Sequence, residues 1–241
     1  MTLINDSFMR TRLLIGEKGL EKLHAARVAV VGLGAVGGFA TEALARAGIG
    51  SLTLADFDTV SVTNINRQIY ALFSTIGQSK ADLAQKRVAD INPACQVRLF
   101  KTRVRSDVLD DLLSPRPDFV VDAIDSLSEK VALITGLQER GIAFISSMGA
   151  AMRTDPSRIR VCRPDEITHC PLTSAVRRRL KRRGASLNFP CVCSDEPREN
   201  LPSPVYENEG DARTVMGSLP SITGIFGLTA ANYAIQHLLR A

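Results

Sequence analysis

Runs of apolar residues alternate with amphipathic stretches along the first 150 residues. Short, β-branched runs predict strands at RVAVVG (27–32), SLTLAD (51–56), QVRLFKT (96–102), DFVVDAID (118–125) and GIAFISSMG (141–149). Apolar residues at helical spacing predict helices between them, at 39–48, 79–91 and 126–140. Strands that alternate with helices are typical of a parallel sheet covered by helices on both faces.

The rest of the chain predicts additions to that sheet. A further strand is expected over IRVCRP (159–164), a helix over 171–184, a mobile acidic and Pro-rich loop over 195–211, and an apolar packing helix over 221–239. The predicted fold class is therefore α/β, a Rossmann-like doubly wound, mostly parallel sheet with a C-terminal extension and a terminal packing helix. We expect a helical N-terminal arm (1–26), a nucleotide-binding domain (27–160) and an extension of the same globular unit (161–241).

Composition excludes several classes of protein. The 241 residues are 45% hydrophobic and 23% charged, which excludes collagen, wholesale disorder and a membrane bundle. The chain contains no apolar run long enough to span a membrane, and its first residues do not resemble a secretory signal. Five irregularly spaced cysteines in a chain of this length favour reduced thiols over a disulfide framework. We therefore expect a cytoplasmic protein without structural disulfides.

The positive charge is concentrated in one segment. Residues 158–183 hold nine Arg or Lys against Asp165 and Glu166, a net charge of +7, whereas the whole chain carries +5. Six of these cations fall in seven consecutive positions: Arg177, Arg178, Arg179, Lys181, Arg182 and Arg183. Such crowding on a helix costs stability unless an anion neutralises it. RNA phosphate is the expected anion, with a membrane surface or a simply solvated helix as the alternatives.

A glycine-rich turn is the strongest motif for binding. Gly32, Gly34 and Gly37 form G-x-G-x-x-G between a predicted strand and a predicted helix, where backbone N–H groups can approach phosphate. Asp56 ends the next strand, 19 residues after Gly37, where a carboxylate can bind ribose hydroxyls. The pattern predicts a nucleotide site; a purely structural turn is the alternative. The glycines alone do not distinguish NAD from ATP.

The segment after Asp56 favours ATP. A dehydrogenase would be expected to enter its next helix directly, whereas about twenty residues intervene here before Lys80. Polar and charged candidates for nucleotide contact lie in this segment: Asp58, Asn64, Asn66, Arg67, Gln68 and Lys80. Arg67 and Lys80 are two cations that can hold a triphosphate, and Lys80 lies at a helix start, where the helix dipole also favours an anion. The alternative for Lys80 is a solvated lysine.

Two carboxylates lie towards the end of the predicted strand over 118–125. Asp122 and Asp125 are expected at the carboxyl edge of the sheet, where ligands bind in open α/β folds. A carboxylate there can hold Mg²⁺ against phosphate oxygens. The alternative is that one of them caps the helix that starts near Ser126.

The combined motifs resemble a known family. GLGAVGG, DFDTV-x-VTNINRQ, GQSK-x-D, INP, VVDAIDS and TDPSRI, in this order, resemble the nucleotide-activating domain of the ubiquitin-activating superfamily. TNINRQ together with FMRTRLLIGEKGLEKL and SSMGAAMRTDP is more narrowly similar to the tRNA threonylcarbamoyladenosine dehydratase family. The resemblance implies ATP-dependent adenylation of a carboxylate over 27–160. It assigns the adenosine to the glycine loop and Asp56, and the phosphates to Arg67 and Lys80. It assigns Mg²⁺ to Asp125.

The resemblance also implies a substrate and partners. The carboxylate would belong to the threonyl group on adenosine 37 of a tRNA anticodon loop, and its adenylate would cyclise with loss of AMP. Arg10 would reach the ATP of a neighbouring subunit, which implies a homodimer; a solvated surface charge is the alternative for this residue. A sulfur- or cysteine-handling partner protein is left open. No thiol step is assigned, since the region before the last helix has Val215-Met216-Gly217-Ser218 where some dehydratases have a cysteine.

Three rival functions remain from the sequence. An adenylyltransferase for a small sulfur-carrier protein would keep the ATP site, but those relatives carry two C-x-x-C pairs on zinc that are missing here. A nicotinamide-dependent oxidoreductase is disfavoured by Arg67 and Lys80. An RNA-binding protein with a relic nucleotide site is disfavoured by the complete set of phosphate-site residues.

Overall fold

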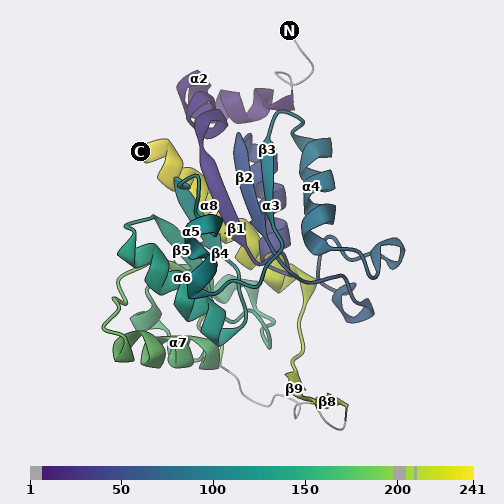
Figure 1. The fold of residues 1–241 in the computed structure, drawn as a ribbon, viewed down its shortest axis with the longest axis vertical. Helices are drawn as coiled ribbons and strands as arrows, with labels where there is room; N and C mark the ends of the chain where they lie inside the picture. The colour runs from purple at the N-terminus through teal and green to yellow at the C-terminus, as the bar shows by residue number, and fades with distance from the viewer. Residues whose placement is uncertain (1–6, 198–204, 209–210) are drawn as a thin grey trace.

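The computed structural model describes residues 7–197, 205–208 and 211–241. Seven strands form one sheet in the order β3-β2-β1-β4-β5-β7-β6 (Figure 1). Their bounds are β1 Arg27–Val31, β2 Ser51–Ala55, β3 Gln96–Phe100, β4 Phe119–Asp122, β5 Phe144–Ser147, β6 Ile159–Cys162 and β7 Cys191–Ser194. All neighbouring strands are parallel except β6, which runs antiparallel to β7 at the sheet edge. The predicted mostly parallel α/β sheet is confirmed.

The helices form layers on both faces of the sheet (Figure 1). Their bounds are α2 Met9–Ala25, α3 Gly37–Ala47, α4 Lys80–Ile91, α5 Leu109–Leu112, α6 Leu127–Glu139, α7 Pro171–Arg182 and α8 Pro220–Arg240. Helices α3 and α8 pack against each other on one face, and α6 and α7 pack together on the other. The predicted helices, including the terminal packing helix, are therefore confirmed to within a few residues.

The central strand β1 shows why the chain folds into layers. Successive strand residues point to opposite faces. Val28 and Val30 accordingly pack into the core under α3 and α8, whereas Ala29 and Val31 pack into the core under α6 and α7. All four side chains are buried. A strand buried on both faces must be apolar at every one of these positions, which is why RVAVVG is a continuous apolar run rather than an alternating one.

A β-hairpin begins within the segment expected to be a loop over 195–211. Strands β8 (Val205–Asn208) and β9 (Asp211–Val215) pair antiparallel and form a two-stranded sheet of their own. The loop prediction is therefore wrong for these residues. The segment is acidic and rich in proline, a composition that does not indicate strands. Its residues form a strand because they pair with β9, and local composition does not reveal that partner. The part of the prediction that covers 198–204 and 209–210 lies outside the described residues.

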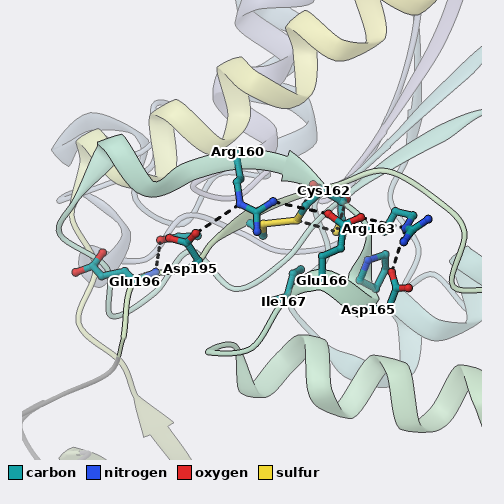
Figure 2. Close-up of a disulfide and its surroundings, with 12 residues drawn as sticks. Arg160, Cys162, Arg163, Asp165, Glu166, Ile167, Asp195 and Glu196 are labelled. Atoms are coloured by element: carbon teal, nitrogen blue, oxygen red, sulfur yellow. Dashed lines mark hydrogen bonds and ion pairs between the residues drawn. A yellow bond between two sulfur atoms is a disulfide. The ribbon is translucent and has the colours of Figure 1, made fainter.

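The expectation of five reduced cysteines is also wrong. Cys162 on β6 and Cys193 on β7 form a disulfide (Figure 2). The two strands pair antiparallel with Cys162 opposite Cys191, so Cys193, two residues further on, presents its side chain on the same face as Cys191. Cys95, Cys170 and Cys191 remain free. The sequence did not indicate that the strands carrying these cysteines are neighbours, since 31 residues separate the bonded pair.

None of the helices in the described part of the chain is both long enough and apolar enough to cross a bilayer. Even α8, with 21 residues, is interrupted by polar side chains such as Asn232, Gln236 and His237.

Candidate functional site

The glycine loop lies at the carboxyl end of β1, where the sheet order reverses. Strand β2 lies on one side of β1 and β4 on the other, and open α/β sheets bind ligands in the crevice beyond the strand ends at such a point. Gly32 has a φ of 90°, and a side chain there would approach the Ala123 carbonyl oxygen at 2.8 Å. A Cβ at Gly37 would lie 1.7 Å from the Gly32 carbonyl oxygen. Only glycine fits at these positions, and the turn brings the start of α3 to the crevice.

Asp56 follows β2 and faces this loop. Its carboxylate accepts hydrogen bonds from the backbone N–H of Leu33 at 2.6 Å and of Asp58 at 2.8 Å. Burial raises the pKa of Asp56 above its ordinary value, and the two backbone hydrogen bonds oppose that shift. Each carboxylate oxygen uses one lone pair on the backbone and keeps another for a ligand hydroxyl. Asp56 is thus both a support of the glycine loop and a candidate acceptor for ribose.

Lys80 lies at the amino end of α4, beside Asp58. Its side chain is buried, and its ammonium lies 3.1 Å from Asp58 Oδ2. The backbone N–H of Lys80 donates to the Asp58 carbonyl oxygen at 3.1 Å, and Ser79 caps the helix by accepting from Asp82 N–H. A buried cation at a helix amino end, with one partly exposed carboxylate as its partner, is well placed to attract phosphate. The alternative of a solvated lysine is therefore wrong.

The asparagine-rich loop between Asp58 and Lys80 is held by its own hydrogen bonds. Arg67 donates from Nη1 to the Thr63 carbonyl oxygen at 2.8 Å and to Asn66 Oδ1 at 2.9 Å. Asn66 donates to the Ser218 carbonyl oxygen at 3.1 Å, which joins the loop to the segment before α8. Asn64 accepts from the backbone of its own turn. Gln68 lies over the glycine loop, since its amide nitrogen is 3.7 Å from the Cβ position of Gly34.

Asp122 is part of the core and is not available to a metal. Its Oδ2 accepts from Lys130 Nζ at 2.7 Å and from Ser146 Oγ at 2.6 Å. All three side chains are fully buried. Asp122 Oδ1 accepts from the backbone N–H of Ile124 at 3.0 Å. The expectation that Asp122 could hold Mg²⁺ is therefore corrected: a lysine neutralises its charge, and its second oxygen holds the loop that carries Asp125.

Sequence reasoning missed Lys130 and Ser146, although a signal exists for the lysine. Leu127, Lys130, Val131 and Ile134 follow the i, i+3, i+4, i+7 spacing of one helix face. A lysine in the middle of an apolar face is costly to bury unless a carboxylate neutralises it. The nearest upstream carboxylate at a strand end is Asp122, so the pair was in principle predictable. The hydroxyl of Ser146 carries no comparable pattern.

Asp125 lies in the loop between β4 and α6 and is exposed. The N-cap residue of α6 is Ser126, and in the described part of the chain neither Asp122 nor Asp125 accepts a hydrogen bond from a backbone N–H of the first helical turn. A single exposed carboxylate suits Mg²⁺, which keeps several waters and commonly takes its other ligands from phosphate oxygens. No group of three metal-binding side chains is assembled in the described part of the chain. The donor set thus fits a magnesium ion that arrives with a nucleotide.

Arg10 is not part of this site within one chain. It is exposed on α2, which precedes β1 and lies at the amino end of the strands (Figure 1). The glycine loop lies at the other end of β1. A five-residue strand is about 16 Å long, more than an arginine side chain can span. A role for Arg10 at a nucleotide site therefore requires the site of a second copy.

The six cations at 177–183 lie in the carboxyl-terminal half of α7 and at its C-cap. Thr173, Val176 and Leu180 of this helix are buried against the protein, whereas Leu172 is partly buried. Arg160 and Arg163 are paired with carboxylates (Figure 2). Arg158 is paired with Asp155. By contrast, no carboxylate of the described residues lies within 4.0 Å of the six cations at 177–183 (Arg177, Arg178, Arg179, Lys181, Arg182, Arg183). The charge excess is therefore located on this helix end.

The side chains of two of the six cations donate hydrogen bonds to other described residues. Arg177 donates to the Ile167 carbonyl oxygen at 3.0 Å, and Arg179 donates to Ser128 Oγ at 2.8 Å. Arg178, Lys181, Arg182 and Arg183 are exposed. These four side chains are the ones best placed to meet a polyanion in solvent.

Comparison with known proteins agrees with the geometry. The chain is 38% identical to the tRNA threonylcarbamoyladenosine dehydratase of Bacillus subtilis, over 97% of this chain and 94% of that protein. The crystal structure of the E. coli tRNA N6-threonylcarbamoyladenosine dehydratase in complex with ATP matches with a TM-score of 0.87 and 35% identity, over 98% of this chain and 94% of that one. The molybdopterin-synthase adenylyltransferase of Salmonella typhimurium is 41% identical, but over 57% of this chain. The ThiF family model matches residues 8–241, and the chain therefore belongs to the ThiF family.

Proposed function

We propose that this protein is an ATP-dependent tRNA threonylcarbamoyladenosine dehydratase, which cyclises the modified adenosine at position 37. The observation that carries the ATP-dependent step is the buried ammonium of Lys80 at the amino end of α4, in the same crevice as the glycine loop and Asp56. Such a cation suits a triphosphate, whose negative charge is larger than that of the diphosphate in a nicotinamide cofactor. The substrate follows from similarity to dehydratases over nearly the whole chain.

The chemistry requires charge stabilisation more than a covalent nucleophile. The threonyl carboxylate oxygen bonds to the α-phosphorus of ATP, and pyrophosphate leaves with the electron pair of the broken P–O bond. The carbamoyl nitrogen then attacks the acyl carbon, loses its proton and expels AMP, which closes the ring. Lys80 and Arg67 would stabilise the negative charge that grows on the departing pyrophosphate. Asp56 would hold the ribose, and the amino end of α3 would approach the phosphates.

Mg²⁺ fits the exposed carboxylate of Asp125. When bound with ATP it would neutralise phosphate charge, which lowers the cost of bringing a second anion, the substrate carboxylate, to the α-phosphorus. Asp122 and Lys130 support this arrangement by holding the backbone that precedes Asp125.

We propose that tRNA docks on the cationic end of α7. The four exposed cations have no carboxylate partner among the described residues, so counterion release on phosphate binding would supply affinity. A tRNA substrate also places the protein in the cytoplasm, where tRNA is used in translation. The free Cys191 is not needed, since burial raises its thiol pKa to about 12 and a protonated thiol is a poor nucleophile.

We also propose a homodimer in which Arg10 of one copy completes the ATP site of the other. The proposal is supported by the distance between α2 and the glycine loop within one chain. Mixing Arg10→Ala subunits with Lys80→Ala subunits should restore activity, because each mixed dimer has one intact site. No recovery after verified subunit exchange would contradict a shared site.

The test of the proposed function is nucleoside mass analysis. Purified protein is incubated with MgATP and tRNA that carries threonylcarbamoyladenosine. The tRNA is then digested to nucleosides, whose masses are measured by mass spectrometry. The expected product is lighter by one water, with AMP and pyrophosphate formed in equal amounts. Lys80→Ala should abolish formation of the lighter nucleoside and of AMP and pyrophosphate. Pyrophosphate release that depends on a small protein ending in Gly-Gly, with no change in the tRNA, would instead support an adenylyltransferase.

A further inference from the structure

Residues 216–219 connect the hairpin strand β9 to helix α8, and two other segments hold them. On one side, Asn66 Nδ2 donates to the Ser218 carbonyl oxygen at 3.1 Å. On the other side, Met152 N–H donates to the Gly217 carbonyl oxygen at 2.9 Å, and Gly217 N–H donates to Met152 Sδ at 3.0 Å. We call residues 216–219 the strap. The strap joins the asparagine-rich loop after β2 to the loop after β5.

The strap lies at the carboxyl end of the sheet. In the strand order, β2 lies on one side of β1, whereas β4 and β5 lie on the other. A connection between the loop after β2 and the loop after β5 therefore spans the carboxyl ends of β1 and β4, which are followed by the glycine loop and by Asp125. Figure 1 shows the β8–β9 hairpin beyond this same end of the sheet.

The loop after β5 is a firm support for the strap. Met152 has a φ of 59°, the single positive value at a non-glycine residue in the described part of the chain. Such a residue is strained and keeps this conformation only where its surroundings fix it, as the two hydrogen bonds with Gly217 do. The carboxylate of Glu196 fixes the next residues, because it accepts from the backbone N–H of Thr154 at 2.9 Å and of Asp155 at 3.0 Å.

The side-chain amide of Asn66 has a partner at each end. Its Oδ1 accepts from Arg67 Nη1 at 2.9 Å, while its Nδ2 donates to the strap at Ser218. The reversed amide would place a donor against the guanidinium and an oxygen against a carbonyl oxygen, so only this orientation suits both partners. Because the amide group is planar and rigid, a movement of the strap that turns it also displaces the oxygen that holds Arg67.

Arg67 is held along one edge of its guanidinium. Nη1 donates to Asn66 Oδ1 and to the Thr63 carbonyl oxygen, which leaves the donors of Nε and Nη2 for phosphate. A cation that is fixed in advance stabilises developing charge without the cost of reorganisation during the reaction. The contacts of Asn66 therefore bear on how well Arg67 acts, not only on where the loop lies.

We propose that Asn66 is a positioning residue, which uses the strap as a fixed support to hold Arg67 where charge grows on the departing pyrophosphate. The inference rests on the proposed ATP-dependent function and adds the strap to it. It implies a reciprocal linkage: a nucleotide that fixes Arg67 also fixes the strap, and a loosened strap also loosens Arg67. The sequence singles out Asn66 only as a candidate for direct contact with the nucleotide.

The first test separates positioning from ATP binding. Asn66→Ala removes both ends of the amide but leaves Arg67 in the chain. We expect kcat for AMP formation, at saturating MgATP and modified tRNA, to fall by about tenfold, with the Kd for MgATP changed by less than about threefold. A raised Kd with an unchanged kcat would show that Asn66 acts as a simple nucleotide contact and would overturn the proposal.

A variant on the far side of the strap tests whether the strap transmits the effect. Met152→Leu keeps a similar volume but removes the sulfur that accepts from Gly217 N–H. We expect kcat to fall by about threefold in the unaltered background and not to fall further in the Asn66→Ala background, since the strap acts through Asn66. Independent losses that multiply in the double variant would contradict this linkage.

Two variants within the asparagine-rich loop show which end of the amide matters. Asn66→Asp keeps the acceptor for Arg67 but places an oxygen against the Ser218 carbonyl oxygen, so it should not restore kcat. A normal kcat for Asn66→Asp would exclude a role for the strap. As a matched control, Gln78→Ala removes another exposed amide of this loop, which donates to the Ser74 carbonyl oxygen at 2.9 Å. It should leave kcat unchanged, and a tenfold loss there would indicate general loosening instead of positioning.

Hydrogen–deuterium exchange of the strap gives a readout that does not depend on turnover. MgATP should slow exchange in peptides that cover 216–219 of the unaltered protein, and it should not do so in Asn66→Ala. If the unaltered protein binds no MgATP, the ATP-dependent function fails and this inference fails with it. If it binds MgATP and the exchange of the strap does not change, the function stands and the inference alone is refuted. Circular dichroism verifies that each variant is folded.

Discussion

The buried ion pair between Asp122 and Lys130 provides a stringent test of the structure. Lys130→Met removes the ammonium but leaves a side chain of similar length and apolar character. The Asp122 carboxylate then remains in a fully buried position with Ser146 Oγ and one backbone N–H as its partners. Its negative charge is no longer neutralised, so the folded state loses stability.

The expected magnitude follows from the complete burial of both partners. Breaking a buried pair by removing one charge costs about 3–5 kcal/mol. For a chain of this size such a loss lowers the thermal midpoint by about 6–20 °C. Removing both charges, with Asp122→Asn and Lys130→Met together, should recover most of the stability, because no uncompensated charge remains and the asparagine can still accept from Ile124.

The assay is urea unfolding followed by circular dichroism for the protein, the two single variants and the double variant. Lys130→Met should shift the midpoint far more than the double variant does. A loss below about 1 kcal/mol for Lys130→Met, or a double variant as unstable as the single one, would refute the buried-pair reasoning.

Three further predictions concern ligand binding. Gly37→Ala should abolish MgATP binding in calorimetry, because its Cβ would lie 1.7 Å from the Gly32 carbonyl oxygen, whereas unchanged binding would refute the tight loop. Since burial raises the pKa of Asp56, its carboxylate becomes protonated at a higher pH than that of an exposed aspartate, so ATP affinity should fall on mild acidification. Protonation of Asp56 itself stabilises the folded state, so a loss of affinity through this group does not arise from unfolding. Asp56→Asn should remove this pH dependence, and its persistence would exclude Asp56. Changing Arg178, Lys181 and Arg182 together to Gln should weaken tRNA binding and flatten its log–log salt slope by up to about 2–3 units. An unchanged slope would exclude α7 as the docking helix.

The alternation of strands and helices was predictable because it rests on local periodicity. RVAVVG, the glycine turn and FATEALARAG each indicate their own structure from adjacent residues. Sequentially adjacent elements of this kind form a parallel sheet with few alternatives. The same locality made the glycine loop, Asp56 and Lys80 identifiable as a candidate nucleotide site, since each is defined by its distance from a strand end or a helix start.

Contacts between distant segments were not predictable in this way. The hairpin of β8 and β9, the Cys162–Cys193 disulfide and the Asn66–Ser218 hydrogen bond each join residues whose proximity no local pattern specifies. Asp122 shows the consequence for function. From the residues alone it was equivalent to Asp125, since both lie at the end of the same predicted strand, and only the family resemblance favoured Asp125. The tertiary structure places Lys130 and Ser146 on Asp122 and leaves Asp125 exposed.

The sequence by itself determined the layered α/β fold, the glycine loop and the residue types that a triphosphate requires, because strand and helix periodicity and turn chemistry are properties of neighbouring residues. Only the tertiary structure decided which carboxylate is buried, which cations are neutralised and at which end of the sheet Arg10 lies. Burial and charge pairing depend on segments that meet only in the folded chain. A charged side chain in the core must find a partner there, whereas the same side chain at the surface is left for a ligand.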